Sequence, residues 1–323
     1  RSTDLIAGTT GIDAVLDGHS HSVIPCDVVN NKEGEKVLLS STGTGLTNIG
    51  QLVITADGNL TTGLIGDFSD KNTEIDSFVK EIQNQYEAEM EQVVARTEES
   101  LTTMSESGIR LIRSRETNLG DFCADAYRTI SGADIAFVNG GGIRADIGVG
   151  DITYGDIIAV HPYGNTLCVV EATGQEILDA LEMASRSTMP EISDGENAVG
   201  ENGGFLQVSG LKYTIDTSIP STVEVDDAGM YVSCGENRRV KDVQVLQEDG
   251  TYAPIDPAQT YTLASHNYLL KQGGDGLNMF MDNTLIINEG MLDYQVLITY
   301  IADDLCGTVG SDYARPQGRI TVK

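Results

Sequence analysis

The sequence predicts an α+β fold, in which helices accompany a mixed or largely antiparallel sheet. Three patterns predict this class. Short strand-like runs between glycine-rich turns open the chain, and one long amphipathic pattern follows over residues 74–96. Helical and strand patterns then alternate through residues 98–323. Hydrophobic residues make up 40% of the chain, which is enough to form packed cores.

The first region is expected to contain short strands and turns. Residues 12–18 are typical of a buried strand that runs into a turn, and residues 38–60 predict strands joined by a hairpin at Ala-Asp-Gly-Asn. In residues 74–96 apolar side chains recur every three or four positions, which predicts a helix with Thr73 and Asp76 as its capping box. We therefore expect three parts: residues 1–70, a linker helix over 71–97, and a domain over 98–323.

The last part should alternate between the two element types. Helices are predicted from Asn118 onward and over 151–160, 173–186 and 291–305, the third with a capping box from Thr173 to Glu176. Strands are predicted over 134–139, 165–172, 205–216, 240–247, 261–266 and 318–323. The acidic stretch 190–204 is predicted to be a solvated loop.

The charge balance limits the partners of the chain. With 49 acidic and 20 basic residues its net charge is −29, which argues against a nucleic-acid partner because a polyanion needs a basic surface. An anion site must then be a local group of arginines. No lysine lies between Lys80 and Lys212, yet one short window holds Arg110, Arg113, Arg115, Arg128 and Arg144. They indicate either carboxylate or phosphate binding or a set of surface charges.

Two further properties exclude other classes. No apolar run reaches the length of a membrane span. The five cysteines show no metal-binding or disulfide spacing and mostly lie in apolar segments, so we expect buried free thiols.

Two segments are candidates for anion binding. Residues 109–121 predict a strand that ends in arginines before the positive end of a helix, with Arg113 and Arg115 on one face if extended. Residues 137–144 read FVNGGGIR, and the triplet of Gly140, Gly141 and Gly142 would let backbone N–H groups approach a ligand beside Arg144. The alternatives are a charged strand edge and a tight turn without a ligand.

Three residues on turns could bind a planar ring and a sugar. Tyr163 in a Pro-Tyr-Gly turn offers a stacking surface for a planar ring, and Asn165 offers a donor and an acceptor. Asp275 in Gly-Gly-Asp-Gly can accept hydrogen bonds from vicinal hydroxyls. A half-buried structural tyrosine and a plain hairpin turn are the alternatives.

A histidine pair is the candidate metal site. His19 and His21 stand two residues apart at the end of a predicted strand, so that both imidazoles would point to one side and share a metal cluster. Two surface histidines in a turn are the alternative.

Five segments together indicate a family. FVNGGGIR, RETNLGDFCADAYR, ITYGDIIAVHPYGNTL, GGFLQVSGLKYTID and NYLLKQGGDG, in this order, resemble the C-terminal domain of the 5′-nucleotidases. DGHSH with its strand-rich continuation and long helix is similar to the end of that family's N-terminal metallophosphatase domain. The resemblance implies an α/β/α-type mixed-sheet domain over 98–323 that binds a nucleotide or nucleoside, and a remnant of the metallophosphatase domain over 1–70.

The resemblance also implies roles for individual residues. His19 and His21 match ligands of two divalent metal ions, and Arg113 and Arg144 match phosphate-binding arginines. The positions matched to the nucleoside and its surrounding loop are Asn139, Gly141, Gly142, Tyr163, Asn165 and Asp275. The family holds the base between two aromatic residues, and the second of these positions is Leu269 here, with Tyr268 beside it.

The intact protein is expected to be a metal-dependent 5′-nucleotidase exported by a bacterium. The other ligand motifs of the two-metal site do not occur before residue 12. We therefore expect this chain to be a fragment that binds nucleotide without hydrolysing it and holds no catalytic residue of its own. A 2′,3′-cyclic-nucleotide phosphodiesterase and a non-catalytic nucleotide-binding surface module are the alternatives.

Overall fold

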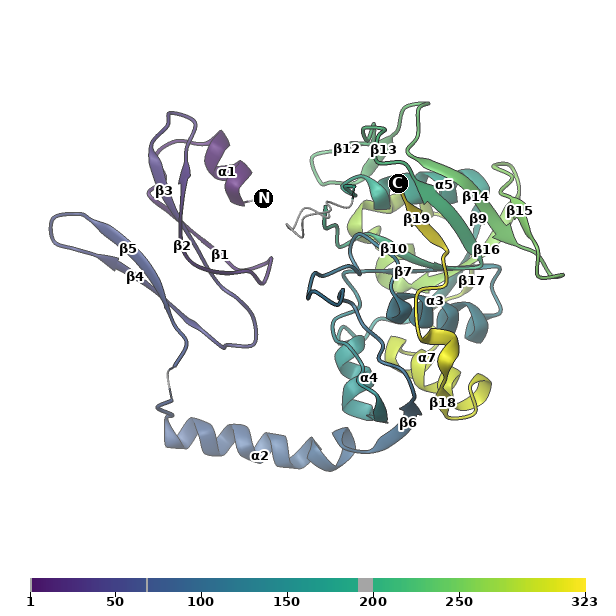
Figure 1. The fold of residues 1–323 in the computed structure, drawn as a ribbon, viewed down its shortest axis with the longest axis horizontal. Coiled ribbons are helices and arrows are strands. Elements are labelled where there is room, and N and C mark those ends of the chain that lie inside the picture. The colour runs from purple at the N-terminus through teal and green to yellow at the C-terminus, as the bar shows by residue number, and fades with distance from the viewer. Residues whose placement is uncertain (1, 68, 191–199) are drawn as a thin grey trace. The chain divides into compact units, whose positions relative to one another are not determined.

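The computed structural model describes residues 2–67, 69–190 and 200–323, and it divides the chain into two compact units. They are Arg1–Ile82 and Gln83–Lys323, so the boundary falls inside helix α2 (Thr73–Met90) (Figure 1). Most of the predicted loop 190–204 lies outside the described residues. No helix that the structure describes is long and apolar enough to cross a membrane.

The first unit contains a three-stranded sheet, a two-stranded sheet and one short helix, besides the start of α2. Its elements are α1 (Ser2–Gly8), β1 (Ala14–Asp17), β2 (Val23–Asn30), β3 (Lys36–Thr42), β4 (Ile49–Ile54) and β5 (Leu60–Ile65). Strand β3 lies between β1, to which it is parallel, and β2, to which it is antiparallel. The predicted hairpin joins β4 and β5. The core consists of Ile6, Val37 and Leu39 with partly buried neighbours.

Helix α2 differs from its prediction at both ends. Asn72, not Thr73, caps it, because the Asn72 side-chain oxygen accepts from the N–H groups of Glu74 (3.1 Å) and Ile75 (3.2 Å). The helix ends at Met90, and the predicted last turn is strand β6 (Val93–Thr97). Its valines and threonine favour a strand, and β6 pairs with β8 (Gly150–Thr153) and β18 (Thr308–Val309).

A five-stranded mixed sheet forms the centre of the second unit. Its strands, in spatial order, are β10 (Leu206–Ser209), β7 (Ile135–Asn139), β16 (Thr260–His266), β9 (Leu167–Thr173) and β17 (Leu285–Ile287). Strands β7 and β16 are parallel, and the other neighbours are antiparallel. The mixed α+β class predicted from the sequence is confirmed.

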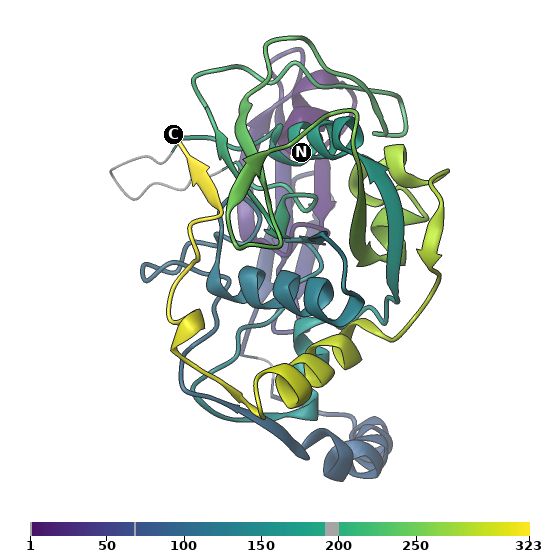
Figure 2. The same cartoon turned by 90° about the vertical axis from the view of Figure 1, so that its right-hand side faces the viewer.

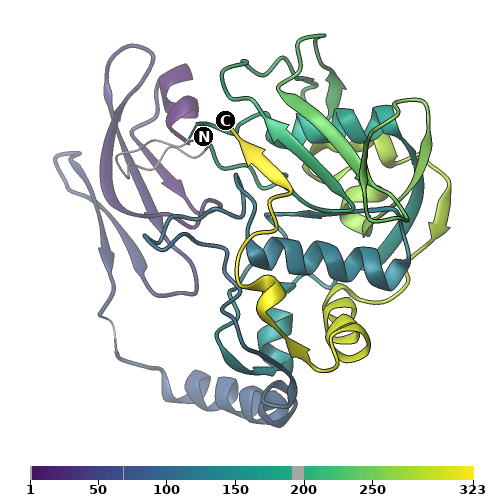
Figure 3. The ribbon, with the colours of Figure 1, turned by 45° about the vertical axis from the view of Figure 1, so that its right-hand side comes forward.

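Both faces of this sheet are covered. Helices α3 (Asn118–Ser131), α4 (Tyr154–Val160) and α7 (Asp293–Thr299) pack on one face, where Ala136 and Val138 of β7 enter the core. Ile135 and Phe137 alternate with them and face helix α5 (Gly174–Ser185) and a second sheet. That sheet contains β15 (Tyr252–Pro254), β14 (Val240–Leu246), β11 (Leu211–Ile215) and β19 (Ile320–Val322). Figure 2 shows α3 and α7 below the strands, and Figure 3 shows the last segment passing α3 into β19.

Helix ends explain most of the remaining differences. Thr117 caps α3 and Thr173 forms the predicted capping box of α5, each by accepting a backbone N–H. The predicted helix 151–160 begins only at Tyr154, because the residues before it belong to β8. Helix α7 is shorter than predicted and continues as a π-helical turn, Tyr300–Asp304. The short elements are β12 (Glu224–Val225), β13 (Tyr231–Ser233), α6 (Asn267–Leu270), Gly274–Gly276, Asn278–Phe280 and Ser311–Tyr313.

The cysteines are free, as predicted, but they are mostly not buried. Cys123 and Cys168 are buried, Cys234 is partly exposed, and Cys26 and Cys306 are exposed. An apolar stretch of sequence around a cysteine is therefore not enough to predict that its side chain is buried.

Candidate functional site

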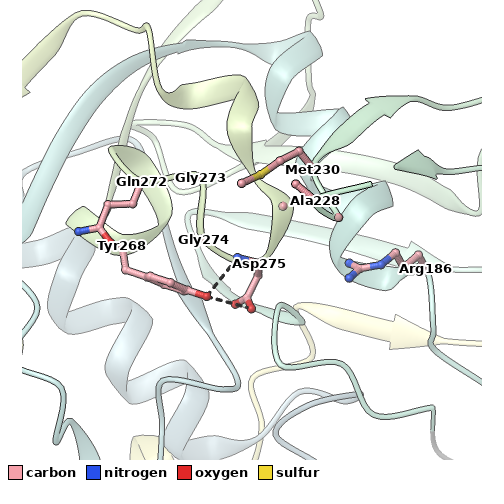
Figure 4. Close-up of a pocket in the computed structure, with 10 residues that line it drawn as sticks. Arg186, Ala228, Met230, Tyr268, Gln272, Gly273, Gly274 and Asp275 are labelled. Atoms are coloured by element: carbon pink, nitrogen blue, oxygen red, sulfur yellow. Dashed lines mark hydrogen bonds between the residues drawn. The ribbon is translucent and has the colours of Figure 1, made fainter. Parts of the chain in front are cut away.

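Asp275 is held by two neighbouring side chains. The Tyr268 hydroxyl donates to Asp275 Oδ1 (3.3 Å) and accepts from the Asp275 N–H (3.2 Å) (Figure 4). Asn139 Nδ2 donates to Asp275 Oδ2 (2.7 Å). Asp275 has a φ of 57°, a left-handed conformation that is uncommon for a residue other than glycine. A Cβ on Gly204 would lie 2.7 Å from Asp275 Cβ, so a glycine is needed for this close approach. The carboxylate is fixed in place at some cost in backbone strain.

A cavity of about 420 Å³ opens beside this carboxylate. Tyr268, Asp275, Arg186, Gln272 and Met230 line it, together with several glycines (Figure 4). Arg186 donates to the Met183 carbonyl at the end of α5 (2.7 Å), and burial lowers the pKa of its guanidinium. The cavity thus has an aromatic ring, a carboxylate and a guanidinium in its wall.

The structure distinguishes Tyr268 from Leu269. Leu269 is 1% exposed and belongs to the core, whereas Tyr268 lines the cavity. Burial raises the pKa of the Tyr268 phenol, and the charge of Asp275 and a smaller effect of Tyr163 raise it further. Tyr163 therefore lies within electrostatic range of Tyr268, and its own side chain is 59% exposed. The two aromatic residues belong to one region of the second unit.

A group of arginines lies near these tyrosines. Burial lowers the pKa of the half-buried Arg113, and the positive charges of Arg110 and Arg144 lower it further. Arg110 is paired with Glu201, with its Nε and a terminal nitrogen donating to the two carboxylate oxygens (2.8 and 2.5 Å). Glu201 and Tyr163 also act on Arg113. The unit therefore holds Arg110 and Arg144 within electrostatic range of Arg113, and Glu201 pairs with Arg110.

The predicted strand through the arginines is wrong. The N–H groups of Ser114 and Arg115 both donate to the Leu111 carbonyl (2.8 Å each), so the segment is a turn. Arg113 and Arg115 consequently do not share a strand face. Arg115 donates to the carbonyls of Ser114 (2.8 Å) and Met189 (2.6 Å).

The glycine triplet packs against the chain itself. The N–H groups of Gly140, Gly141 and Gly142 donate to the carbonyls of Phe205, Gly203 and Asn139 (2.7, 2.7 and 2.9 Å). The prediction that these N–H groups approach a ligand is therefore wrong. A Cβ on Gly140 would lie 2.1 Å from the Ile112 carbonyl oxygen. The triplet brings the turn that carries Arg113 close to Asn139, and Arg144 donates to the Gly141 carbonyl (3.4 Å).

Asn165 has partners of its own. Its N–H donates to the buried Asp293 carboxylate (3.0 Å), and its carbonyl accepts from the Asp293 N–H (2.8 Å). These bonds tie the loop after Tyr163 to the start of α7. Burial raises the pKa of Asp293, and the charge of His161 opposes this effect.

The predicted strand geometry of the histidine pair is wrong. Strand β1 ends at Asp17, the His21 N–H donates to the Gly18 carbonyl (3.3 Å), and His21 has a φ of 58°. His19 and His21 thus lie on an exposed turn of the first unit. Within the described ranges, no group of three or more His, Cys, Asp or Glu side chains could hold a metal ion. The histidine pair does not constitute a metal centre by itself.

Three polar residues are among those of the site that were not predicted. Arg186 follows a helix, and Glu201 lies in the acidic stretch, where nothing in the sequence distinguishes it from its neighbours. His266 ends β16, and its Nε2 lies 3.0 Å from Asn139 Oδ1. One signal could have identified His266, because it is one of only four histidines in the chain and ends a predicted strand.

Comparisons with known proteins identify one family for this chain. Residues 93–282 match the family model described as 5′-nucleotidase, C-terminal domain. The chain is 31% identical to the trifunctional nucleotide phosphoesterase protein YfkN of Bacillus subtilis over 92% of its own length and 19% of that protein. It is 28% identical to the cell wall protein Lmo0130 of Listeria monocytogenes, over 90% of this chain and 35% of that one.

A solved structure is similar as well. The crystal structure of a 5′-nucleotidase precursor from Thermus thermophilus superposes with a TM-score of 0.77 and 27% identity, covering 99% of this chain and 61% of that one. The fold and the match define a domain found in nucleotide-processing hydrolases. The chain belongs to the 5′-nucleotidase C-terminal domain family. It spans less than two thirds of the length of each of these three proteins.

Proposed function

We propose that residues 98–323 form the substrate-binding domain of a phosphoesterase that hydrolyses nucleoside monophosphates. The observation that carries this proposal is the half-buried Arg113 beside Arg110 and Arg144, in the same unit as the Asp275 cavity. Like charges held together in a protein of net charge −29 support an anionic ligand, because a bound anion offsets their mutual repulsion.

Each part of a nucleotide has a proposed partner. Arg113 and Arg144 bind the phosphate, whose charge offsets the repulsion between them. The Asp275 carboxylate accepts hydrogen bonds from the ribose hydroxyls. Tyr163 and Tyr268 stack on the base, with Asn139 and Asn165 as polar contacts, while Gly141 and Gly142 shape the loop behind Arg144. The proximity of Tyr163 to both Arg113 and Tyr268 supports this arrangement.

Hydrolysis requires more than this chain is expected to supply. We propose His19 and His21 as two ligands of the metal ions that such a reaction uses, and we propose that the whole protein is exported, as the name of the cell wall relative suggests. Two imidazoles are fewer than the three protein ligands typical of a catalytic metal site. We therefore expect the 323-residue chain to bind AMP without hydrolysing it. Metal-dependent release of phosphate from AMP by the purified chain would contradict this expectation.

Calorimetric titration with AMP tests the binding proposal. Tyr163→Ala should weaken AMP binding by about 1–3 kcal/mol, the value of one stacking contact. Tyr86→Ala is the matched control, since Tyr86 is a comparably exposed tyrosine on α2 and should have no effect. The proposal is wrong if the folded wild-type chain does not bind AMP, or if the two variants weaken binding equally.

A further inference from the structure

His266 is buried behind the candidate site and does not line the cavity. It is the last residue of β16 and is 2% exposed. Its ring lies edge-on to Tyr127, with centroids 6.3 Å apart and an interplanar angle of 75°. The centroid of the Tyr268 ring lies 6.0 Å from that of His266, with an interplanar angle of 34°. The imidazole is therefore held by two aromatic neighbours, one of which belongs to the site.

A chain of hydrogen bonds joins His266 to Asp275 through Asn139. His266 Nε2 lies 3.0 Å from Asn139 Oδ1, and Asn139 Nδ2 lies 2.7 Å from Asp275 Oδ2. Bond lengths alone do not distinguish the oxygen from the nitrogen of an amide, but the chemistry of the partners does. A carboxylate only accepts, so the amide NH₂ of Asn139 must face Asp275 and its oxygen must face His266.

This orientation determines the tautomer of His266. The Asn139 oxygen only accepts, so His266 Nε2 must carry a proton and donate it. Burial, followed by the charge of His161, lowers the pKa of His266 to about 3, so the ring is neutral at physiological pH. A neutral imidazole protonated on Nε2 has a bare Nδ1. The direction of every bond between β16 and the carboxylate is thereby determined.

We infer that His266 is a positioning residue for ribose recognition, because its Nε2–H fixes the Asn139 amide and, through it, the Asp275 carboxylate. A carboxylate offers about four lone-pair sites. Asn139 uses one and the Tyr268 hydroxyl uses another, which leaves two for the vicinal hydroxyls of a ribose. Without the donor at His266, the Asn139 amide is held only through its bond to Asp275, so its side chain and the carboxylate are less firmly positioned. This inference rests on the proposed function. It adds a residue that contributes to the selectivity of the candidate site for ribose.

The effect should be specific for the sugar. We define the ribose ratio as the dissociation constant of 2′,3′-dideoxyadenosine divided by that of adenosine. His266→Leu removes the donor and keeps an apolar side chain next to Tyr127 and Tyr268. It should lower the ribose ratio about fivefold, the value of one weakened hydrogen bond. His266→Gln places an amide N–H near the position of Nε2 and should keep the ratio within about twofold of wild type. A residue that only fills space would change the affinity for both ligands in parallel.

The experiment is calorimetric titration of the wild type and the two variants with both nucleosides, after thermal melts have shown that each is folded. ¹⁵N NMR of the ligand-free wild type should also report a neutral His266 protonated on Nε2. A ratio that falls in His266→Leu and recovers in His266→Gln supports the inference. An unchanged ratio in folded His266→Leu, or a proton on Nδ1, overturns it.

Two other outcomes are also decisive. If His266→Leu does not fold, Asn139→Ala takes its place, because it breaks the same chain one residue nearer to the carboxylate and should lower the ratio. An unchanged ratio in Asn139→Ala would overturn the inference. If the wild type binds neither nucleoside nor AMP, the proposed function fails and the inference fails with it. If the wild type binds and only the ratio is insensitive, the proposed function stands and only the inference fails.

Discussion

Replacing Arg113 should affect binding and stability in opposite directions. The Arg113 guanidinium is half-buried and repelled by Arg110 and Arg144, so it destabilises the ligand-free protein. A bound phosphate would offset this effect. Arg113→Met keeps most of the apolar stem and removes the charge. One charge-assisted hydrogen bond to phosphate contributes about 1.5–3 kcal/mol, so AMP should bind about 10- to 150-fold more weakly.

The stability of the ligand-free variant should not fall. Relief of a like-charge contact adds roughly 0.2–0.5 kcal/mol to the free energy of unfolding. Arg110→Met should do the opposite and lower it by about 0.2–1 kcal/mol, because it breaks the pair with Glu201. Adenosine, which has no phosphate, should bind wild type and Arg113→Met equally.

Calorimetry with AMP and adenosine, together with urea unfolding, measures these quantities. Arg96→Met is the control, since Arg96 is an exposed arginine of the same unit that pairs with Asp151. Two results would refute the reasoning: equal AMP affinity in Arg113→Met and wild type, or an equal loss of affinity for AMP and adenosine. The first would exclude a phosphate contact, and the second would indicate general damage to the site.

Three further predictions concern stability. Gly140→Ala should lower the free energy of unfolding by more than about 2 kcal/mol or prevent folding, because its Cβ would lie 2.1 Å from the Ile112 carbonyl oxygen. Gly148→Ala is the control: its Cβ would meet open space, so it should leave the free energy of unfolding unchanged in the same urea titration. Thr173→Ala should cost about 1 kcal/mol by removing the N-cap of α5, and an unchanged unfolding midpoint would count against the capping box. Burial lowers the pKa of His266 to about 3, so below pH 6.5 the unfolded chain binds a proton on this imidazole that the folded chain does not bind. The contribution of His266 to stability is therefore fully present above pH 6.5. As the pH falls toward 3, the free energy of unfolding should decrease by up to about 1.4 kcal/mol per pH unit. Urea titrations over this range should show a shallower fall in His266→Gln and an unchanged one in His19→Gln, which alters an exposed histidine; identical slopes in all three proteins would contradict the burial argument.

The sequence predicted an element correctly where the element is stabilised by contacts between residues close together in the chain. The capping box at Thr173 and the hairpin between β4 and β5 depend on residues a few positions apart, so the sequence contained all the information. The buried strand β7 was equally clear, because every residue in it is apolar except Asn139. The end of α2 was not predictable, since Val93–Thr97 become a strand only by pairing with β8 and with β18 far along the chain.

For the candidate site, the sequence determined which residue types are present, and the tertiary structure decided what each of them faces. The arginines, Tyr163 and Asp275 were recognisable because their side chains and turns have a chemistry of their own. Whether the glycine N–H groups face a ligand depended on carbonyls 62 and 65 residues away, and these accept from two of the three N–H groups. Tyr268 and Leu269 are adjacent in sequence, and only the path of the backbone around Asp275 directs the tyrosine to the cavity and the leucine to the core. Long-range packing makes that choice, because hydrogen bonds and burial depend on neighbours in space and not on neighbours in the chain.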